Sequence, residues 1–198
     1  MKVRGVEIRF SAAFHHGSGF GIAGLLDRAV LRDSRGMPYL AGSAIKGKFR
    51  HAMLRLLLSA GEQPCHYGDD PGKCSPCALC SIFGSRLKPG VLSFSDAFPS
   101  ESLQAPLTAL HKASRVFPGD SHVRPGIGLD RGLGTTRRHL LFSTETLPAS
   151  LVFRGTIRGD LGDNLEELLL ESSRILNHFG SGSSHGLGAC EYRFVEEP

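Results

Sequence analysis

The sequence predicts an α+β fold built from four strands and two amphipathic helices. Two observations support this class. Residues 3–14 alternate apolar and polar side chains, which is typical of a half-buried strand. Residues 43–60 instead place apolar side chains at helical spacing, so that one face of the helix is apolar. The chain therefore shows both the two-residue period of strands and the 3.6-residue period of helices.

The remaining elements follow in a recognisable order. Strands are predicted at 91–96, 151–157 and 190–194, and a second helix at 163–179. The order strand, helix, strand, strand, helix, strand is the ferredoxin-like βαββαβ arrangement, which RNA-recognition (RRM) domains also use. We expect one domain over residues 1–198. It carries insertions at about 61–90, which is irregular, and at about 97–146, where proline, glycine and arginine recur with little periodicity.

Composition sets the class but not the partner. The chain has 198 residues, of which 40% are hydrophobic and 21% charged, as in soluble globular proteins. No apolar run reaches membrane-spanning length and the N-terminus lacks a signal-peptide apolar region, so we expect a cytoplasmic protein without a membrane partner. The net charge of +4 is too mild to prove a polyanion partner, but residues 34–61 hold five Lys and Arg and no acid.

These basic residues gather where the first helix begins. Ser43 is a plausible N-cap, and the unpaired N–H groups of a helix start attract anions. Gly47 costs roughly 1 kcal/mol in a helix interior, which suggests that a backbone or a phosphate must come close. The alternative is a basic solvated helix with ordinary caps. The predicted phosphate-binding residues are Ser43, Lys46, Lys48 and Arg50.

Four closely spaced cysteines favour a metal over disulfides in a cytoplasmic protein. They are Cys65, Cys74, Cys77 and Cys80. Structural Zn²⁺ held by four thiolates is the expected form, and it would order a loop without a core of its own. His66 could replace Cys65. An iron–sulfur cluster is the alternative, but its usual continuation would put a cysteine at position 84, which is Gly84.

Several of these stretches, in this order, resemble the signature of the RAMP superfamily, and specifically the backbone subunit of type III CRISPR effector complexes. The resemblance rests on Leu25-Leu26-Asp27, on the stretch 37–50, on Phe83-Gly84, on 94–97 and on the glycine-rich 180–188. It covers nearly the whole chain. Ala41 departs from the pattern, because the family usually has proline there.

The resemblance implies a ferredoxin-like palm that binds a guide CRISPR RNA alongside neighbouring copies or paralogous subunits. The second insertion would form a thumb that wedges into the duplex of guide and target RNA. One loop aspartate would cut the target RNA, with Mg²⁺ or another divalent ion, and its position here is Asp27. The protein would thus be an RNA-guided endoribonuclease of antiviral defence.

The chemistry of two segments can be weighed from the residues themselves. The Asp27 carboxylate could help a ribose 2′-OH attack a strained phosphate, or it could be a turn residue paired with Arg28. The glycine-rich loop could let backbone N–H groups approach phosphates, or it could be a flexible connector. The resemblance favours guide-RNA contact for this loop. Its predicted RNA-binding residues are Gly180, Ser181, Gly182, Ser183, Ser184, His185 and Gly186.

Two other functions stay open. One is a non-cleaving scaffold subunit with the same fold. The other is a RAMP-type endonuclease that processes guide precursors, in which His15, His16 or His185 would carry the activity.

Overall fold

The computed structural model of the chain describes residues 2–65, 77–85, 88–113 and 119–196. Its main sheet has five strands: β1 (Val3–Phe10), β2 (Ser93–Phe94), β3 (Phe98–Pro99), β6 (Val152–Arg158) and β7 (Cys190–Val195). The order is β2-β6-β1-β7, with β3 also paired to β6, and every pair is antiparallel. The first strand of the chain therefore lies inside the sheet, between two later strands.

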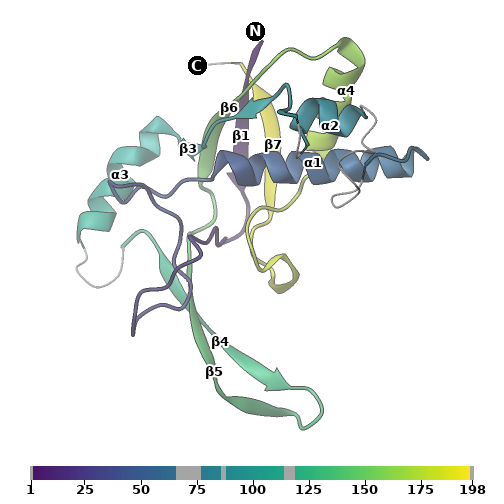
Figure 1. Cartoon of the computed structure of the whole chain (residues 1–198). Helices are drawn as coiled ribbons and strands as arrows, with labels where there is room; N and C mark the ends of the chain where they lie inside the picture. The colour runs from purple at the N-terminus through teal and green to yellow at the C-terminus, as the bar shows by residue number, and fades with distance from the viewer. Residues whose placement is uncertain (1, 66–76, 86–87, 114–118, 197–198) are drawn as a thin grey trace.

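Helices pack against this sheet and against each other. They are α1 (Gly42–Ser59), α2 (Ala78–Phe83) and α4 (Asp163–Arg174). Helix α1 contacts α4, α2 and β2, and α4 contacts β7. Figure 1 shows α1 crossing the strands, with α2 and α4 beside it. In the described part of the chain, no helix is long and apolar enough to span a bilayer.

A separate two-stranded sheet projects from the rest of the molecule. It is the hairpin of β4 (His122–Asp130) and β5 (Thr135–Thr146), and it follows helix α3 (Glu101–Ala113). Figure 1 shows the hairpin extending away from the main sheet, at the opposite end from the two chain termini. The hairpin therefore presents much of its surface outside the core.

Aromatic rings fill the centre of the core, where β1, β6 and the segments that follow β1 and α4 meet. Phe10 stacks on Phe14, and Phe153 meets both rings edge-on, with centroids 5.8 Å and 5.7 Å away. Phe179 meets Phe10 edge-on as well. All four side chains are buried. Such packing adds directional aromatic contacts to the hydrophobic effect.

The α+β class is confirmed, while several boundaries differ from the predicted ones. The first strand ends at Phe10 rather than at residue 14, and the last helix ends at Arg174 rather than near 179. The predicted irregular insertions contain α2, α3 and a long hairpin. The sequence does not predict helix α3 because Pro106 lies in its interior, and proline at such a position usually ends a helix.

Truncating the central ring of the core tests this packing. Phe153→Ala should lower the free energy of unfolding by about 3–5 kcal/mol, because it leaves a cavity beside the rings of Phe10 and Phe14. Urea unfolding at neutral pH measures this. The matched control is Phe20→Ala, whose ring is 78% exposed, and it should change stability by less than about 0.5 kcal/mol. Equal losses in the two variants would contradict the assigned core.

Candidate nucleic-acid interface and metal centre

The start of α1 is capped by another segment of the chain. The helix begins at Gly42, whose N–H donates to Oδ1 of Asp96 at 2.8 Å. The predicted N-cap role of Ser43 is therefore wrong: Ala41 holds that position and no side chain of its own caps the helix. Gly42 is needed here, because an added Cβ would lie 2.4 Å from the carbonyl oxygen of Phe94. An incoming anion would share this helix end with a carboxylate, which weakens the predicted dipole effect.

Basic side chains beside the helix start make a better anion site than the helix end itself. A hollow of about 490 Å³ lies between the first turns of α1 and the segment after α2. Its described lining comprises Gly42, Ser43, Lys46, Phe83, Gly84, Ser85, Lys88, Pro89, Gly90, Leu92, Ser93 and Phe94. Among these residues Lys46 and Lys88 are charged and none is acidic. We call this site the basic hollow.

The four residues predicted on α1 do not form one cluster. Ser43 and Lys46 line the basic hollow. Arg50 donates from Nη1 to the carbonyl oxygen of Gly84 at 2.8 Å, so it braces the wall of the hollow. Lys48 lies toward Cys190 of β7. Burial raises the pKa of the Cys190 thiol to about 12, and the positive charge of Lys48 partly offsets this rise. Apart from its chain neighbours and the backbone of its own helix, no described atom lies within 4 Å of a Cβ built on Gly47, so the space beside Gly47 is open.

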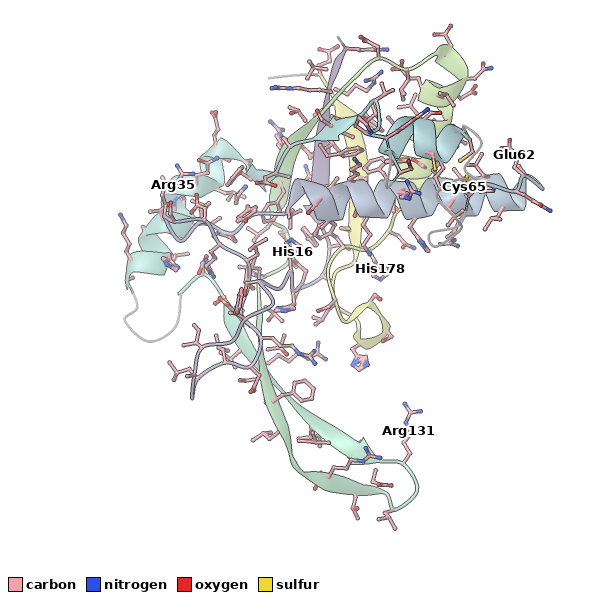
Figure 2. The ribbon with its side chains drawn as sticks, in the orientation of Figure 1. His16, Arg35, Glu62, Cys65, Arg131 and His178 are labelled. Atoms are coloured by element: carbon pink, nitrogen blue, oxygen red, sulfur yellow. The ribbon has the colours of Figure 1, made fainter. Side chains whose placement is uncertain are left out.

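The glycine-rich segment is a hydrogen-bonded turn rather than a loose connector. The Ser181 N–H donates to the carbonyl oxygen of His15 at 3.0 Å, and a short 3₁₀ turn, η2, follows at Ser183–His185. Gly180 has φ +86°, and an added Cβ would lie 2.3 Å from that same carbonyl oxygen, so glycine is required there. Figure 2 labels His178, which pairs with Ala189 at the base of this turn. The predicted residues Ser181 and 183–186 are exposed, and Gly182 is half-buried.

Asp27 lies on an exposed loop that is fastened to the hairpin. Its Oδ2 accepts hydrogen bonds from the N–H of Ser143 at 2.7 Å and from the hydroxyl of Ser143 at 3.1 Å. These bonds lower the pKa of Asp27 below its ordinary value. Arg28 is not its main partner, since that guanidinium lies over the ring of Phe142. Asp27 also lines an open hollow of about 570 Å³ with residues 21–26 and Ser143.

The chemistry available at Asp27 is that of one ionised, exposed carboxylate. Among the described residues, the one group of three or more metal-binding side chains is the cysteine cluster, so Asp27 does not belong to such a group. Mg²⁺ is commonly held by one or two carboxylates together with substrate phosphates and water. The residues present therefore fit a metal that an RNA phosphate helps to bind, and not a preformed protein site.

Glu145 on β5 holds the loop that carries Asp27. It is 2% exposed. Its Oε2 accepts from the N–H of Val30 at 2.7 Å, and its Oε1 from Arg32 at 2.8 Å. Its own N–H donates to the carbonyl oxygen of Arg28 at 2.9 Å. The loop is therefore hydrogen-bonded to the hairpin through both backbone and side-chain groups.

A second buried carboxylate shares the same guanidinium. Both oxygens of Asp120 accept from Arg32, at 2.8 Å and 3.0 Å, in a bidentate pair. Neither Asp120 nor Glu145 was predicted as part of a site. Arg32 lies 88 residues from Asp120 and 113 from Glu145, and no local pattern connects such positions.

The two consecutive histidines are structural in this arrangement. His15 is buried and its Nδ1 donates to the carbonyl oxygen of Glu145 at 2.6 Å. His16 accepts the Ala41 N–H at Nε2, and burial, together with the neighbouring His15, lowers its pKa. Figure 2 shows His16 next to the start of α1. His16, with a lowered pKa and an Nε2 that already accepts a hydrogen bond, is a poor acid for cleavage.

Three of the four predicted metal ligands converge. The sulfur atoms of Cys65, Cys77 and Cys80 lie within 4.8 Å of one another, a spacing that one tetrahedral ion could bridge. Cys74 and the alternative ligand His66 lie outside the described residues. Burial raises the pKa of the Cys77 thiol, but hydrogen bonds from Cys65 and Cys80 bring it down to about 7 from 9.0. A thiolate is the form that binds zinc. Figure 2 shows Cys65 beside α2.

An antiparallel sheet with helices packed on it, a projecting hairpin and a basic hollow define a class of α+β protein with a surface suited to anions. The model of the RAMP superfamily matches residues 11–191. The chain therefore belongs to the RAMP superfamily, and the resemblance of the sequence to that superfamily is confirmed. A comparison with curated protein sequences finds no match.

Solved structures with a similar fold include two that are described as Type III-B Cmr-beta. One is described as "Type III-B Cmr-beta Cryo-EM structure of the Apo state", with 14% identity, a TM-score of 0.65 and coverage of 98% of each chain. Another is "Cryo-EM structure of the Type III-B Cmr-beta bound to cognate target RNA", with 14% identity and a TM-score of 0.66. That alignment covers 99% of this chain and 98% of the other. At this identity the likeness concerns the fold.

The buried charge network should make stability depend on pH. Burial raises the pKa of Glu145, but bonds from Arg32 and from the Val30 N–H outweigh it, so its pKa in the folded protein lies below 4.5. A carboxyl with a lowered pKa in the folded state stabilises the protein above its unfolded pKa, and this contribution is lost as pH falls through the folded value. At pH 7, Glu145→Gln should cost about 1–3 kcal/mol.

Urea midpoints of the wild type and of Glu145→Gln, measured from pH 7 down to about 3, test this linkage. The difference between them should shrink once the pH falls below 4.5. The control is Glu171→Gln, which removes an exposed ion pair with Arg174 and should change stability by less than about 0.5 kcal/mol. A difference between wild type and Glu145→Gln that stays constant across the range would contradict the assigned ionisation.

Proposed function

We propose that this chain is a backbone subunit of a type III CRISPR effector complex, which binds a guide CRISPR RNA together with neighbouring copies or paralogous subunits. The observation that carries this proposal is the basic hollow, where Lys46 and Lys88 face one cavity with no acid among its described lining residues. Membership of the RAMP superfamily and the likeness to chains of Cmr complexes support it.

The architecture supports a palm and a thumb within one domain over residues 1–198. The strand order β2-β6-β1-β7, with helices after β1 and β6, agrees with a ferredoxin-like palm. The hairpin of β4 and β5 is the candidate thumb. Several large apolar side chains are exposed on it, and these could pack against bases. They are Ile127, Leu129, Leu133, Leu140 and Leu141.

In this proposal the protein contacts the RNA backbone and not the bases. Lysine ammonium groups attract phosphates, while serine hydroxyls and exposed N–H groups of the glycine-rich turn add hydrogen bonds. Sequence choice then comes from base pairing between guide and target RNA, as in other guided systems. A protein of this kind needs few base contacts of its own.

Target cleavage is assigned to Asp27. Its carboxylate is ionised, exposed and fixed at the base of the hairpin by Ser143, where a distorted RNA strand would pass. Such a carboxylate can accept the proton of a ribose 2′-OH as that oxygen attacks the adjacent phosphorus, which restricts the reaction to RNA. The bond from phosphorus to the 5′-oxygen of the next nucleotide breaks, which leaves a 2′,3′-cyclic phosphate and a 5′-oxygen that takes a proton from water. A divalent ion such as Mg²⁺, bound by Asp27 and a phosphate oxygen, would stabilise the developing negative charge.

A second candidate function, the non-cleaving scaffold, is favoured by one observation. One oxygen of Asp27 already holds the loop to β5, so the residue has a structural role without any catalysis. The guide-processing alternative is less well supported, because His15 and His16 are both engaged within the fold and His185 alone of the three is exposed.

For the cysteine cluster we propose a structural Zn²⁺ held by Cys65, Cys77 and Cys80, with Cys74 as the fourth ligand. Three converging sulfur atoms support it. The ion would join the segment after α1 to α2, a helix of six residues that is too short to be stable alone.

Charge reversal tests the basic hollow. Lys46→Glu and Lys88→Glu should each weaken binding of a labelled guide-length RNA about tenfold at low salt, and should lower the slope of log affinity against log salt by about one. Arg50 is a poorer test because it also braces Gly84. The control is Arg55→Glu, an exposed charge on α1 outside the hollow. Equal affinities for all three variants would contradict the site.

The role of Asp27 is separated from its structural bonds by Asp27→Asn, which keeps an oxygen for Ser143. In a reconstituted complex, cleavage of a complementary RNA should fall by about 10²-fold or more, with target binding within about twofold of wild type. Ser143→Ala removes the hydroxyl bonds to Asp27 and Leu25 but keeps the Ser143 N–H bond to the Asp27 carboxylate, and should retain most of the cleavage. Full cleavage by Asp27→Asn would leave the scaffold as the better description.

A further inference from the structure

The cysteine cluster and the basic hollow lie at the two ends of one short helix. Cys77 is the N-cap of α2 and Cys80 lies within it. Gly84 is its C-cap, with φ +85°, and already lines the hollow. The two sites are therefore separated by fewer than two turns of backbone.

The wall of the hollow depends on where α2 ends. The N–H of Ser85 donates to the carbonyl oxygen of Lys88 at 2.8 Å, which closes the turn that carries this lysine. An added Cβ on Gly90 would lie 2.4 Å from the N atom of Gly84, so the backbones of these two glycines are in close contact. Arg50 holds the same turn to α1 through Gly84. A shift of α2 would therefore move Lys88 relative to Lys46.

Apolar side chains hold one face of α2 against the core, whereas the cysteine cluster lies at its first turn. Leu79, Ile82 and Phe83 are buried, and the ring of Phe83 stacks on that of Phe94. These contacts hold the helix against the core. At its first turn, the sulfur atoms of Cys77 and Cys80 lie within 4.8 Å of that of Cys65, which belongs to the chain that follows α1.

We propose that metal binding by Cys65, Cys77 and Cys80 controls the affinity of the basic hollow for RNA, by fixing α2 and thereby the separation of Lys46 and Lys88. This inference rests on the proposed RNA-binding function. Loss of the metal lets the helix tilt about its apolar contacts, and the two lysines no longer face one phosphate path. The cysteine centre is thus a regulatory element for nucleic-acid binding as well as a stabilising one.

The experiment uses the full chain, with zinc content measured by atomic emission and affinity measured with a labelled guide-length single-stranded RNA. Cys80→Ser should lose zinc and bind RNA at least fivefold more weakly. The control Cys190→Ala removes a buried thiol on β7 outside the cluster, and should keep both zinc and affinity. In a Lys46→Glu background, Cys80→Ser should weaken RNA binding by less than twofold, because both changes act on one site.

If Cys80→Ser does not fold, wild-type protein stripped of metal by a chelator serves instead, and Zn²⁺ added back should restore the affinity. The coupling is overturned if folded, zinc-free protein binds RNA as tightly as the zinc-loaded protein, or if Cys80→Ser and Lys46→Glu weaken binding independently. Wild-type protein that is loaded with zinc but binds no RNA would overturn the proposed function itself, and the coupling with it.

Discussion

The pair His15-His16 is the junction through which the candidate functional segments are held together. The His15 ring donates to the hairpin at Glu145, while its backbone carbonyl accepts from the glycine-rich turn at Ser181. The His16 ring accepts from Ala41 at the start of α1. Because the junction is largely buried, each of these polar groups must keep its partner, and their loss would cost more than an exposed hydrogen bond.

This junction explains how segments far apart in the sequence are joined in the fold. The loop after β1 carries Asp27 and is tied to β5 through Ser143 and Glu145. The same loop begins at the two histidines, which also position the helix start and the glycine-rich turn. The basic hollow lies further along, between α1 and the turn after α2. One rigid junction therefore sets the distances between phosphate-binding and cleaving groups in the proposed function.

The sequence predicts well those features that depend on local periodicity. The alternation in β7 and the helical spacing in α1 appear in the structure, because burial on one face imposes a repeat on the residues. The prediction that the first strand is half-buried is wrong, because Arg4 and Glu7 of β1 are buried as well as its apolar side chains. Three of four predicted cysteine ligands converge for a similar reason, since short spacings limit where the chain can go.

Features that depend on distant partners could not be read in this way. Asp96 replaces Ser43 as the group that satisfies the helix start, and Glu145 anchors a loop more than a hundred residues away. Such contacts are fixed by sheet topology and leave no periodic signal. The histidines illustrate the same limit, because a polar pair at a strand end looks like a surface feature until the segments packed on it are known.

The most direct test of this account is amide hydrogen exchange of the full chain with and without a guide-length RNA. The account predicts slower exchange in the RNA-bound protein at the first turns of α1, at residues 84–85 and 88–90 and in the glycine-rich turn at 181–186, with α4 unchanged. Protection confined to α4 and the outer strands, with none at the start of α1, would contradict it.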